Sequence, residues 1–372
     1  MSTLHITALD TLFFKDGKPF SMGEETWANG IFPPFPSVFY GALRSIWFAQ
    51  AANINMIANA TNDRSQTNDE SLNLRITGLL PTIDNELFFP IPNDLYGIKR
   101  GAQNEAHKLK CISKPPDLIT DYSFDCLLQT KEVIKAEELG GKALLCRHNF
   151  ETYLKNTSDS FTISRLSDYV LSEPKVGIGR NPNTRSTETG QLYRVAMRRL
   201  HSDIRNGNGK AFGFAVKCNG LPLPENGLSR FGAEIKAIEY KPFSGNWNIA
   251  CPVQEGEKHF KIYLATPAVF EDGFYPKQWF QDNKLELLTA AFGRVQHIGG
   301  FDMKAVKPKP MYKAVPAGTV YYVKAANGFS QSLKDELHGG SIYNLASVTD
   351  DFKIEFYPQG FGLSYVGNFN IE

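Results

Sequence analysis

Alternating apolar and polar residues predict a strand close to the N-terminus. Within residues 4–9, apolar residues alternate with His5 and Thr7, which is typical of a strand with one buried face. A proline-rich loop occupies residues 31–36, and Ser37 after it is a good N-cap for a helix. The chain is therefore predicted to open with a strand, a loop and a helix.

The predicted helix has two faces of different character. At about 100° per residue, one face is an apolar stripe that we expect to pack on the core. Its members are Phe39, Leu43, Ile46 and Trp47. The other face carries Ser37, Tyr40, Gly41 and Arg44. Because Gly41 has no side chain, this face leaves open space beside the helix.

Later segments predict two successive mixed α/β units. Strands of the first unit are predicted over residues 175–180, 191–200, 211–217 and 233–240. In the second unit we predict strands over residues 260–265, 320–324 and 352–356 and a short helix over 285–292. The polar residues 61–71 predict a mobile insertion. Because the regular βα alternation of a parallel sheet is absent, the fold class is predicted as α+β with two ferredoxin-like domains.

Length and net charge narrow the possible classes of protein. A chain of 372 residues is long enough for about two domains. Its 40 Lys and Arg nearly balance its 39 Asp and Glu, which excludes a uniformly basic nucleic-acid coat and a highly charged disordered chain. Local charged patches remain compatible with the near-zero total.

Neither a membrane span nor a secreted disulfide framework is predicted. The most apolar stretch, residues 31–52, contains three prolines, Gly41 and Arg44, unlike a bilayer span of ~20 apolar residues. Residues 1–10 lack the basic and apolar regions of a signal peptide. The five cysteines are an odd number and are widely spaced, so a cytoplasmic location with a reducing environment is expected.

The sequence contains no established catalytic or metal-binding motif. It has no Gly-x-Ser-x-Gly elbow, no Walker loop and no His-Glu-x-x-His. Residues 177–180 are only half of a dinucleotide fingerprint, because Pro182 occupies the third glycine position. The seven histidines are scattered along the chain. We therefore predict no catalytic residue, no metal and no cofactor.

Basic residues are concentrated in two windows. Residues 165–217 contain ten Lys and Arg against four Asp and Glu, a local charge of +6, and residues 294–313 contain five against Asp302, giving +4. Lys307 and Lys309 stand on a stiff Lys-Pro-Lys-Pro segment. Fixed positive charges of this kind can follow a phosphate chain. Solvated faces, or pairs with acids elsewhere in the fold, explain these charges equally well.

Glycines accompany the basic residues or enclose an aromatic residue in three segments. These segments are residues 177–180, 299–304 and 360–362. Glycine lets main-chain N–H groups approach phosphate oxygens, and an aromatic residue such as Phe361 can stack on a base. A core anchor after a turn is an equally good interpretation of Phe361.

Several segments together resemble subunit three of the Cmr complex, the type III-B CRISPR RNA-guided effector, which belongs to the RAMP superfamily. They follow the order of that family across nearly the whole chain. The matching segments are LFFKDGKPF (12–20), FPPFPSVFYGALR (32–44), GIGR (177–180), GQLY (190–193), YLATPAVF (263–270), GGFD (299–302), KPKP (307–310), VPAGTVY (315–321) and GFG (360–362). The arginine-rich loop 181–188 departs from the family pattern, and the insertion 61–71 has no counterpart in it.

The resemblance implies two ferredoxin-like (RRM-like, RAMP) domains with insertions. The N-terminal domain is expected over residues 1–245, with insertions over about 53–170 and a basic hairpin over about 175–217. The C-terminal domain is expected over residues 246–372, with a glycine-rich loop at 360–362.

The resemblance also implies a function without catalysis. A family member of this kind binds the 5′ tag of the guide RNA and docks the large polymerase-like subunit, which supports target-RNA interference and antiviral defence. Neighbouring RAMP subunits are further expected partners, target RNA is an indirect one, and no membrane is involved. Resemblance and charge pattern together give as RNA-binding candidates Ser37, Tyr40, Gly41, Arg44, Gly177, Gly179, Arg180, Arg185, Arg194, Arg198, Lys304, Lys307, Lys309, Gly360, Phe361 and Gly362.

Two other functions stay open at this point. A RAMP endoribonuclease that processes precursor guide RNA would need a general acid or base, for which His5 and His201 are the candidates. A purely structural adaptor would contact protein and no nucleic acid. The near-neutral net charge is compatible with an adaptor and with an RNA-binding subunit alike.

Overall fold

The computed structural model describes residues 1–15, 27–28, 30–51, 69–98, 104–118, 123–200, 211–271, 273–302, 306–343 and 355–372. The description includes side chains except at residues 27, 28, 51, 188–192 and 302. All five cysteines are free. Within the described ranges, no helix is long and apolar enough to cross a membrane.

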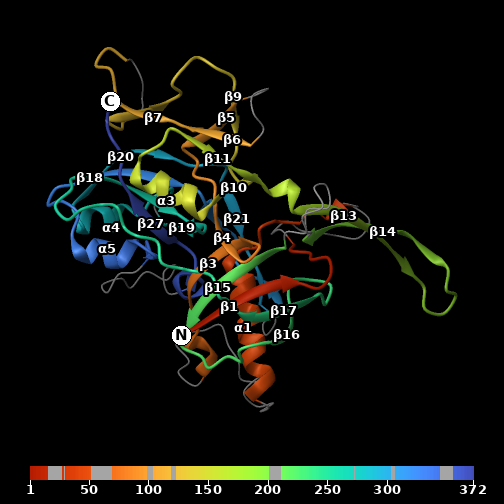
Figure 1. The fold of residues 1–372 in the computed structure, drawn as a ribbon. Helices are drawn as coiled ribbons and strands as arrows, with labels where there is room; N and C mark the ends of the chain where they lie inside the picture. The colour runs from red at the N-terminus through yellow and green to blue at the C-terminus, as the bar shows by residue number, and fades with distance from the viewer. Residues whose placement is uncertain are drawn as a thin grey trace.

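The first unit is built on an antiparallel sheet of eight strands (Figure 1). From edge to edge the order is β12-β10-β4-β3-β15-β1-β17-β16. The strands are β1 (Ser2–Ala8), β3 (Arg75–Ile83), β4 (Glu86–Pro90), β10 (Ala143–Cys146), β12 (Ser164–Arg165), β15 (Phe212–Asn219), β16 (Gly227–Arg230) and β17 (Ala237–Pro242). Counted along the chain, the four central strands β3, β15, β1 and β17 lie in the spatial order two, three, one, four.

Helix α1 (Pro36–Ala51) follows β1 along the chain and packs against this sheet. Its predicted apolar stripe is buried, with Phe39 and Leu43 almost inaccessible to solvent. The ring of Phe39 meets that of Phe214 on β15 edge to face, with 5.0 Å between centroids. The strand and helix predicted at the start of the chain are therefore confirmed.

The second unit is built on a five-stranded sheet with two short helices. The strand order is β20-β25-β18-β27-β26. The elements are β18 (His259–Leu264), α4 (Lys277–Asp282), β20 (Leu285–Ala291), β25 (Val320–Ala325), α5 (Gln331–Leu337), β26 (Gly340–Ser341) and β27 (Leu363–Gly367). Counted along the chain, β20, β25, β18 and β27 again lie in the order two, three, one, four.

The prediction of a helix over residues 285–292 is wrong, because these residues form strand β20. The leucines and alanines of this segment favour a helix when judged alone. In the fold they pair antiparallel with β25 from Leu285 to Ala291, with a bulge between Leu287 and Thr289. Pairing with a neighbouring strand overrides a weak local preference.

Smaller sheets and single turns complete the fold. The smaller sheets have the orders β11-β6-β5-β9, β7-β8, β13-β14-β2, β19-β24-β21 and β22-β23. Their strands are β2 (Trp27–Ala28), β5 (Leu95–Ile98), β6 (Glu105–Lys108), β7 (Lys110–Ser113), β8 (Cys126–Gln129), β9 (Ala136–Glu138), β11 (Ser160–Thr162), β13 (Val170–Arg180), β14 (Thr187–Leu200), β19 (Ala268–Val269), β21 (Gln296–Ile298), β22 (Phe301–Asp302), β23 (Lys307–Pro308) and β24 (Tyr312–Val315). Helix α3 (Arg147–Lys155) lies between β10 and β11. The 3-10 helices η1 (Glu70–Asn73), η2 (Leu166–Asp168) and η3 (Tyr357–Gln359) precede β3, β13 and β27.

The two units share a continuous core. Asp94 of the first unit is fully buried and accepts hydrogen bonds from Tyr153 of α3 and from Tyr322 of β25 in the second unit, at 2.8 and 2.6 Å. The hydroxyl of Tyr263 on β18 donates to the carbonyl oxygen of Pro90 at 2.6 Å. The hydrogen bonds from Tyr322 and Tyr263 cross the boundary and fix one unit against the other.

Strands β13 and β14 form a long hairpin that extends away from the body of the molecule (Figure 1). The hairpin is anchored at its base, where the backbone of Leu12 exchanges two hydrogen bonds with that of Arg198, both at 2.7 Å. The predicted hairpin over 175–217 is too long at its C-terminal end. It ends at Leu200, and β15 belongs to the main sheet.

Candidate nucleic-acid interface

The hairpin has an anchored face and an exposed face. Val195 and Met197 of β14 are buried against Phe13. Arg194 and Arg198 occupy the alternate positions of the strand and therefore lie on the opposite face. Val176 of β13 pairs with Arg194 and so shares that face.

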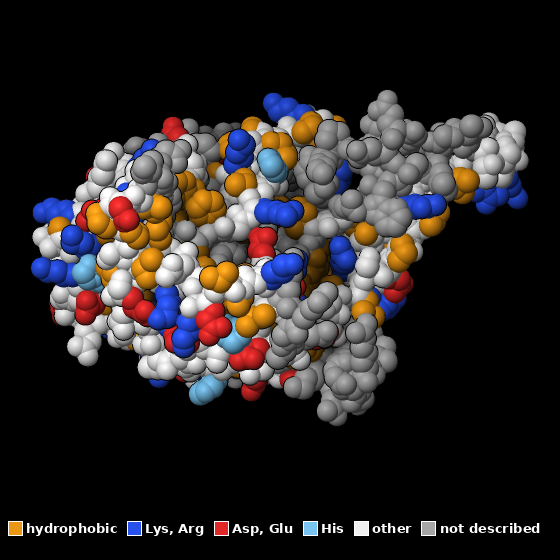
Figure 2. Space-filling model, turned by 90° about the horizontal axis from the view of Figure 1, so that it is seen from above, with side chains coloured by type: hydrophobic (Ala, Val, Ile, Leu, Met, Phe, Trp, Pro, Cys, Tyr) orange, Lys and Arg blue, Asp and Glu red, His pale blue; other side chains and the backbone are white. Residues whose placement is uncertain are grey.

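We call the face made of Val176, Ile178, Arg194 and Arg198 the outer face of the hairpin. Arg194 is exposed, whereas Arg198 is half-buried and its Nε is buried. Val176 and Ile178 are 60% and 47% exposed. Figure 2 shows Lys and Arg side chains along the protruding hairpin, mixed with hydrophobic ones. A surface that combines fixed cations with exposed apolar groups suits an RNA strand, which offers phosphates and unstacked bases.

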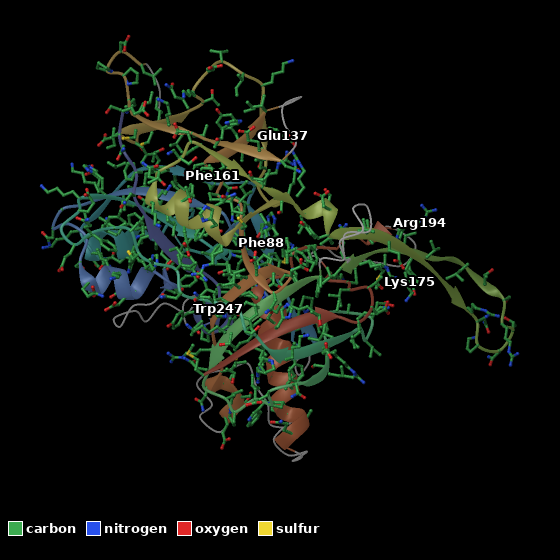
Figure 3. All side chains as sticks on the ribbon, viewed as in Figure 1. Phe88, Glu137, Phe161, Lys175, Arg194 and Trp247 are labelled. Carbon is green, nitrogen blue, oxygen red and sulfur yellow. The ribbon has the colours of Figure 1, made fainter. Side chains whose placement is uncertain are left out.

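The hairpin carries an excess of positive charge. Residues 170–200 contain six Lys and Arg against two Glu, a difference of +4. Among these cations, Arg199 bonds Glu173 at 2.5 Å, and Lys175 bonds Glu234 at 2.6 Å. The hydrogen bond from Arg199 lowers the pKa of Glu173. Figure 3 labels Lys175 and Arg194 on the two strands.

The tip of the hairpin is an ordered loop. The guanidinium of Arg180 donates from Nε and Nη2 to the carbonyl oxygen of Arg185, at 3.2 and 2.9 Å. The side-chain oxygen of Asn181 accepts from the N–H of Asn183 at 2.9 Å. Because the partner of Arg180 is a backbone carbonyl, its charge is not neutralised by that contact, and both arginines remain suited to binding phosphate.

The two glycines of β13 have structural roles in the hairpin. A Cβ on Gly177 would lie 2.1 Å from the ring of Tyr193, its partner across the hairpin. Gly179 lies where the register of the two strands shifts between Ile178 and Arg180. Gly177 is half-buried beside the Tyr193 ring, and its contact with a phosphate stays a prediction.

On helix α1 the structure corrects the role expected for Arg44. Its Nη2 lies 3.0 Å from Asp69 Oδ2, with side-chain exposures of 11% and 5%, and its Nε donates to Ser71 Oγ at 2.9 Å. An internal carboxylate therefore neutralises this guanidinium, and a phosphate would have to displace Asp69. Tyr40 is buried as well.

Two other residues of this helix face stay accessible. Gly41 is exposed, and a Cβ there would meet nothing within 4 Å. Ser37 is half-buried at the start of the helix. The helix contacts η3, so this face lies beside the segment that leads into the glycine-rich turn.

The glycine-rich turn at 360–362 belongs to the core. Phe361 is fully buried in the second hydrophobic cluster. Gly360 and Gly362 have φ values of 88° and 67°, and a Cβ at either would lie within 2.8 Å of Ile76 or Tyr343. The core-anchor interpretation of Phe361 is confirmed, and an enclosed ring cannot stack on a base. RNA contact by the backbone of Gly360 and Gly362 stays a prediction.

The second basic window lies in the second unit. Lys307 is exposed on β23, and Lys309 lies 3.6 Å from Glu355. Lys304 lies outside the described residues. Strands β22 and β23 form a small sheet of their own, which is not hydrogen-bonded to the hairpin sheet.

The histidine considered as a general base lies inside the first unit. His5 is 5% exposed, and its Nε2 is 2.8 Å from the hydroxyl of Thr82. Burial lowers the pKa of His5, and its ring lies against that of Phe243. His201 lies outside the described residues. In the part of the chain that is described, no group of three or more His, Cys, Asp or Glu side chains could hold a metal ion.

Sequence reasoning missed the apolar part of the outer face. Val176 and Ile178 are separated by Gly177 in a strand rich in charge, and this alternation resembles a half-buried strand. The apolar outer face can be told from a buried face by the sequence of the partner strand. On β14, Val195 and Met197 already supply the buried side of the same hairpin.

Comparisons with known proteins agree with this architecture. In the cryo-EM structure of the type III-B Cmr-beta bound to cognate target RNA, one chain matches with a TM-score of 0.54 and 16% identity, over 97% of this chain and 95% of that one. The structure of Cmr-beta with cognate target RNA and AMPPnP, state 1, contains a match with a TM-score of 0.50 at the same identity and coverage. At this identity the similarity establishes a shared fold.

Among curated protein sequences, none matches the chain significantly. The family model described as CRISPR-associated protein (Cas_Cmr3) matches residues 4–368, nearly the whole sequence. This match agrees with the resemblance noted in nine segments of the sequence. The chain therefore belongs to the Cas_Cmr3 family of CRISPR-associated proteins.

Proposed function

We propose that this chain is a non-catalytic, RNA-binding subunit of a type III-B CRISPR effector complex, and that it binds the 5′ tag of the guide RNA. Family membership supports the assignment to such a complex. The chains with the same fold come from Cmr-beta assemblies bound to target RNA.

The outer face of the hairpin carries this proposal. It projects from the body, it bears Arg194 and Arg198 four residues apart on one strand, and Arg180 and Arg185 continue the positive charge at the tip. Each phosphate bound there displaces condensed counterions, while Val176 and Ile178 offer apolar contact to unstacked bases.

The arrangement of strands supports two ferredoxin-like units. In each unit four adjacent strands follow the order two, three, one, four, with a helix after the first strand. The second unit also has a helix, α5, between its third and fourth strands, which completes a β-α-β-β-α-β succession. A boundary near residues 245 and 246 falls between β17 and β18.

Docking of the large polymerase-like subunit is the second part of the proposal. Large apolar side chains are exposed around β21, β22 and β24, namely Phe292, Val295, Phe301 and Met311. Exposed apolar residues that are grouped in this way favour a protein partner. Neighbouring RAMP subunits are further proposed partners, and the cytoplasm is the proposed location of the complex.

The test is binding of tagged guide RNA by the assembled complex. Arg180→Gln combined with Arg194→Gln should weaken binding about 10-fold or more, because charged hydrogen bonds to phosphate contribute about 1–3 kcal/mol. Lys175→Gln on the same hairpin is the matched control, since Lys175 is already paired with Glu234. Equal affinities for the double variant and the wild-type complex would contradict the proposal.

A further inference from the structure

Two of the five cysteines lie next to each other on the small hairpin of strands β7 and β8. Cys111 pairs with Leu128 and Ser113 pairs with Cys126, so the two cysteines are diagonal neighbours on one face of this hairpin. Both side chains are buried, with exposures of 4% and 3%. The other three cysteines lie outside these two strands.

The two thiols are in direct contact. Burial raises the pKa of both thiols, and a hydrogen bond between them adds to the rise at Cys111 and opposes it at Cys126. Both are therefore protonated at neutral pH, and their sulfur atoms are already close together. A disulfide requires a further approach of the two sulfurs, to about 2.05 Å.

The surroundings of the hairpin permit this approach. A disulfide joins Cα atoms that are ~4.4–6.8 Å apart, whereas diagonal neighbours on paired strands are ~7–8 Å apart. The two strands must therefore move together slightly. Because β7 and β8 form a sheet of their own, no ladder of a larger described sheet has to break. A bridge that forms under some strain is also more easily reduced, which makes it reversible.

A small oxidant can reach the pair from solvent. A cavity of about 130 Å³ lies beside β7, and Cys111 lines it. The exposed residues Asp159 and Glu372 line the same cavity, so it reaches the molecular surface. A water molecule occupies ~30 Å³ in the liquid, so the cavity has room for a molecule as small as hydrogen peroxide.

We propose that Cys111 and Cys126 are a redox site, at which hydrogen peroxide converts the two thiols into a reversible disulfide. The Cys111 sulfur attacks one peroxide oxygen, the O–O bond breaks, and the thiol proton leaves with the hydroxide as water. The Cys126 sulfur then attacks the sulfenic sulfur, the S–O bond breaks, and its proton leaves with the hydroxide as a second water. Two thiols and one peroxide thus give one disulfide and two waters. A dithiol reductant restores both thiols and is itself oxidised to a disulfide.

The bridge would restrain the chain around β8. Phe124, two residues before Cys126, packs edge to face on Phe274, with 6.1 Å between ring centroids. Phe274 in turn stacks on the exposed Phe292. A movement of Cys126 is therefore passed on to an exposed aromatic surface. The site belongs to a different sheet from strands β13 and β14, so this inference does not depend on the proposed RNA-binding function.

The test is peroxide treatment of the folded full-length chain, followed by peptide mapping in a mass spectrometer without reduction. We expect one bridged peptide pair that contains residues 111 and 126 and has lost two hydrogen atoms, and dithiothreitol should separate it. The thiolate is the reactive form and both pKa values lie above neutral, so the rate should rise about 10-fold per pH unit between pH 7 and 9. Backbone amides of 110–113 and 126–129 should exchange hydrogen more slowly in the oxidised form.

Cys218→Ala is the matched control, because Cys218 is a buried cysteine of β15 in another sheet. It should leave the rate of bridge formation unchanged. Cys126→Ala should abolish the bridge and let Cys111 proceed to a sulfinic acid. A bridge that forms only after unfolding in urea, or oxidation of the folded chain at other cysteines with none joining residues 111 and 126, would overturn the inference. Because this mapping uses the wild-type chain, the result does not depend on whether a variant folds.

Discussion

Lys261 on β18 gives a prediction that can be worked out from the structure. Its side chain is fully buried, and its ammonium has no hydrogen-bond partner among the described residues. The Nζ atom lies 3.4 Å from the centroid of the Tyr153 ring. Burial lowers the pKa of Lys261 from 10.5 to about 7, with Asp94 acting against the shift and Lys108 adding to it.

This shift makes stability depend on pH in a definite direction. Between about pH 7 and 10.5 an unfolded lysine carries its proton, whereas the folded one has lost it. The unfolded state therefore binds more protons, and the free energy of unfolding rises with pH by about 1.4 kcal/mol per unit. Below pH 7 both states are protonated, so the full cost of burial, at most about 5 kcal/mol, is present there.

Lys261→Met removes the charge and keeps the length of the side chain. The lowered pKa reflects the net cost of the buried charge, so the variant should be more stable than the wild type by up to about 5 kcal/mol at pH 6.5. This advantage should shrink by about 1.4 kcal/mol for each unit above pH 7. The buried thiols of Cys111 and Cys126, whose pKa values are raised by burial, are present in both proteins and cancel in the difference.

The assay is urea denaturation of both proteins at pH 6.5, 7.5 and 8.5. Lys324→Met on the neighbouring strand β25 is the matched control, because its side chain is 48% exposed and pairs with Glu286 at 3.5 Å. That variant should change the free energy of unfolding by less than about 0.5 kcal/mol at each pH. A difference between Lys261→Met and wild type that does not vary with pH, or a less stable variant at pH 6.5, would refute the reasoning.

Three further predictions concern the turn, the helix and the hairpin. Gly362→Val should lower the free energy of unfolding by at least 2 kcal/mol in calorimetry, because φ is 67° and Tyr343 lies 2.8 Å from the added Cβ; Gly41→Ala in open space on α1 is the comparison and should leave it unchanged or raised. Arg44→Met should cost about 3–5 kcal/mol because it removes the guanidinium that neutralises the buried Asp69 carboxylate. Adding Asp69→Asn should recover part of that loss in a double-mutant cycle, and purely additive losses would contradict the pairing. Arg180→Gln with Arg194→Gln should reduce the slope of log affinity against log salt for guide RNA by about 1.4, since each phosphate contact on a single strand contributes about 0.7, and an unchanged slope would exclude both arginines from the contact.

Local pattern was sufficient for the elements at the start of the chain. The alternation around His5 and the stripe through Phe39 and Leu43 predicted β1 and α1. Both signals depend only on which face of one element meets the core, and this face repeats at the period of the element itself. The family could be recognised from the sequence because nine short matching segments follow the order of the family along the chain.

Tertiary structure decided the roles of the individual candidates. The pattern around Phe361 suits an exposed turn and a core anchor equally. Its burial in the second hydrophobic cluster, with its ring against that of Phe356, made it the second.

Arg44 was predicted as a phosphate ligand, yet its partner Asp69 lies twenty-five residues away along the chain and reaches it only in the folded state. The segment 285–292 became a strand because β25 offered an edge to pair with. A side chain's neighbours are set by long-range packing. The sequence therefore predicts which residues have the chemistry to bind a phosphate, and the fold determines which of them are already neutralised by another side chain.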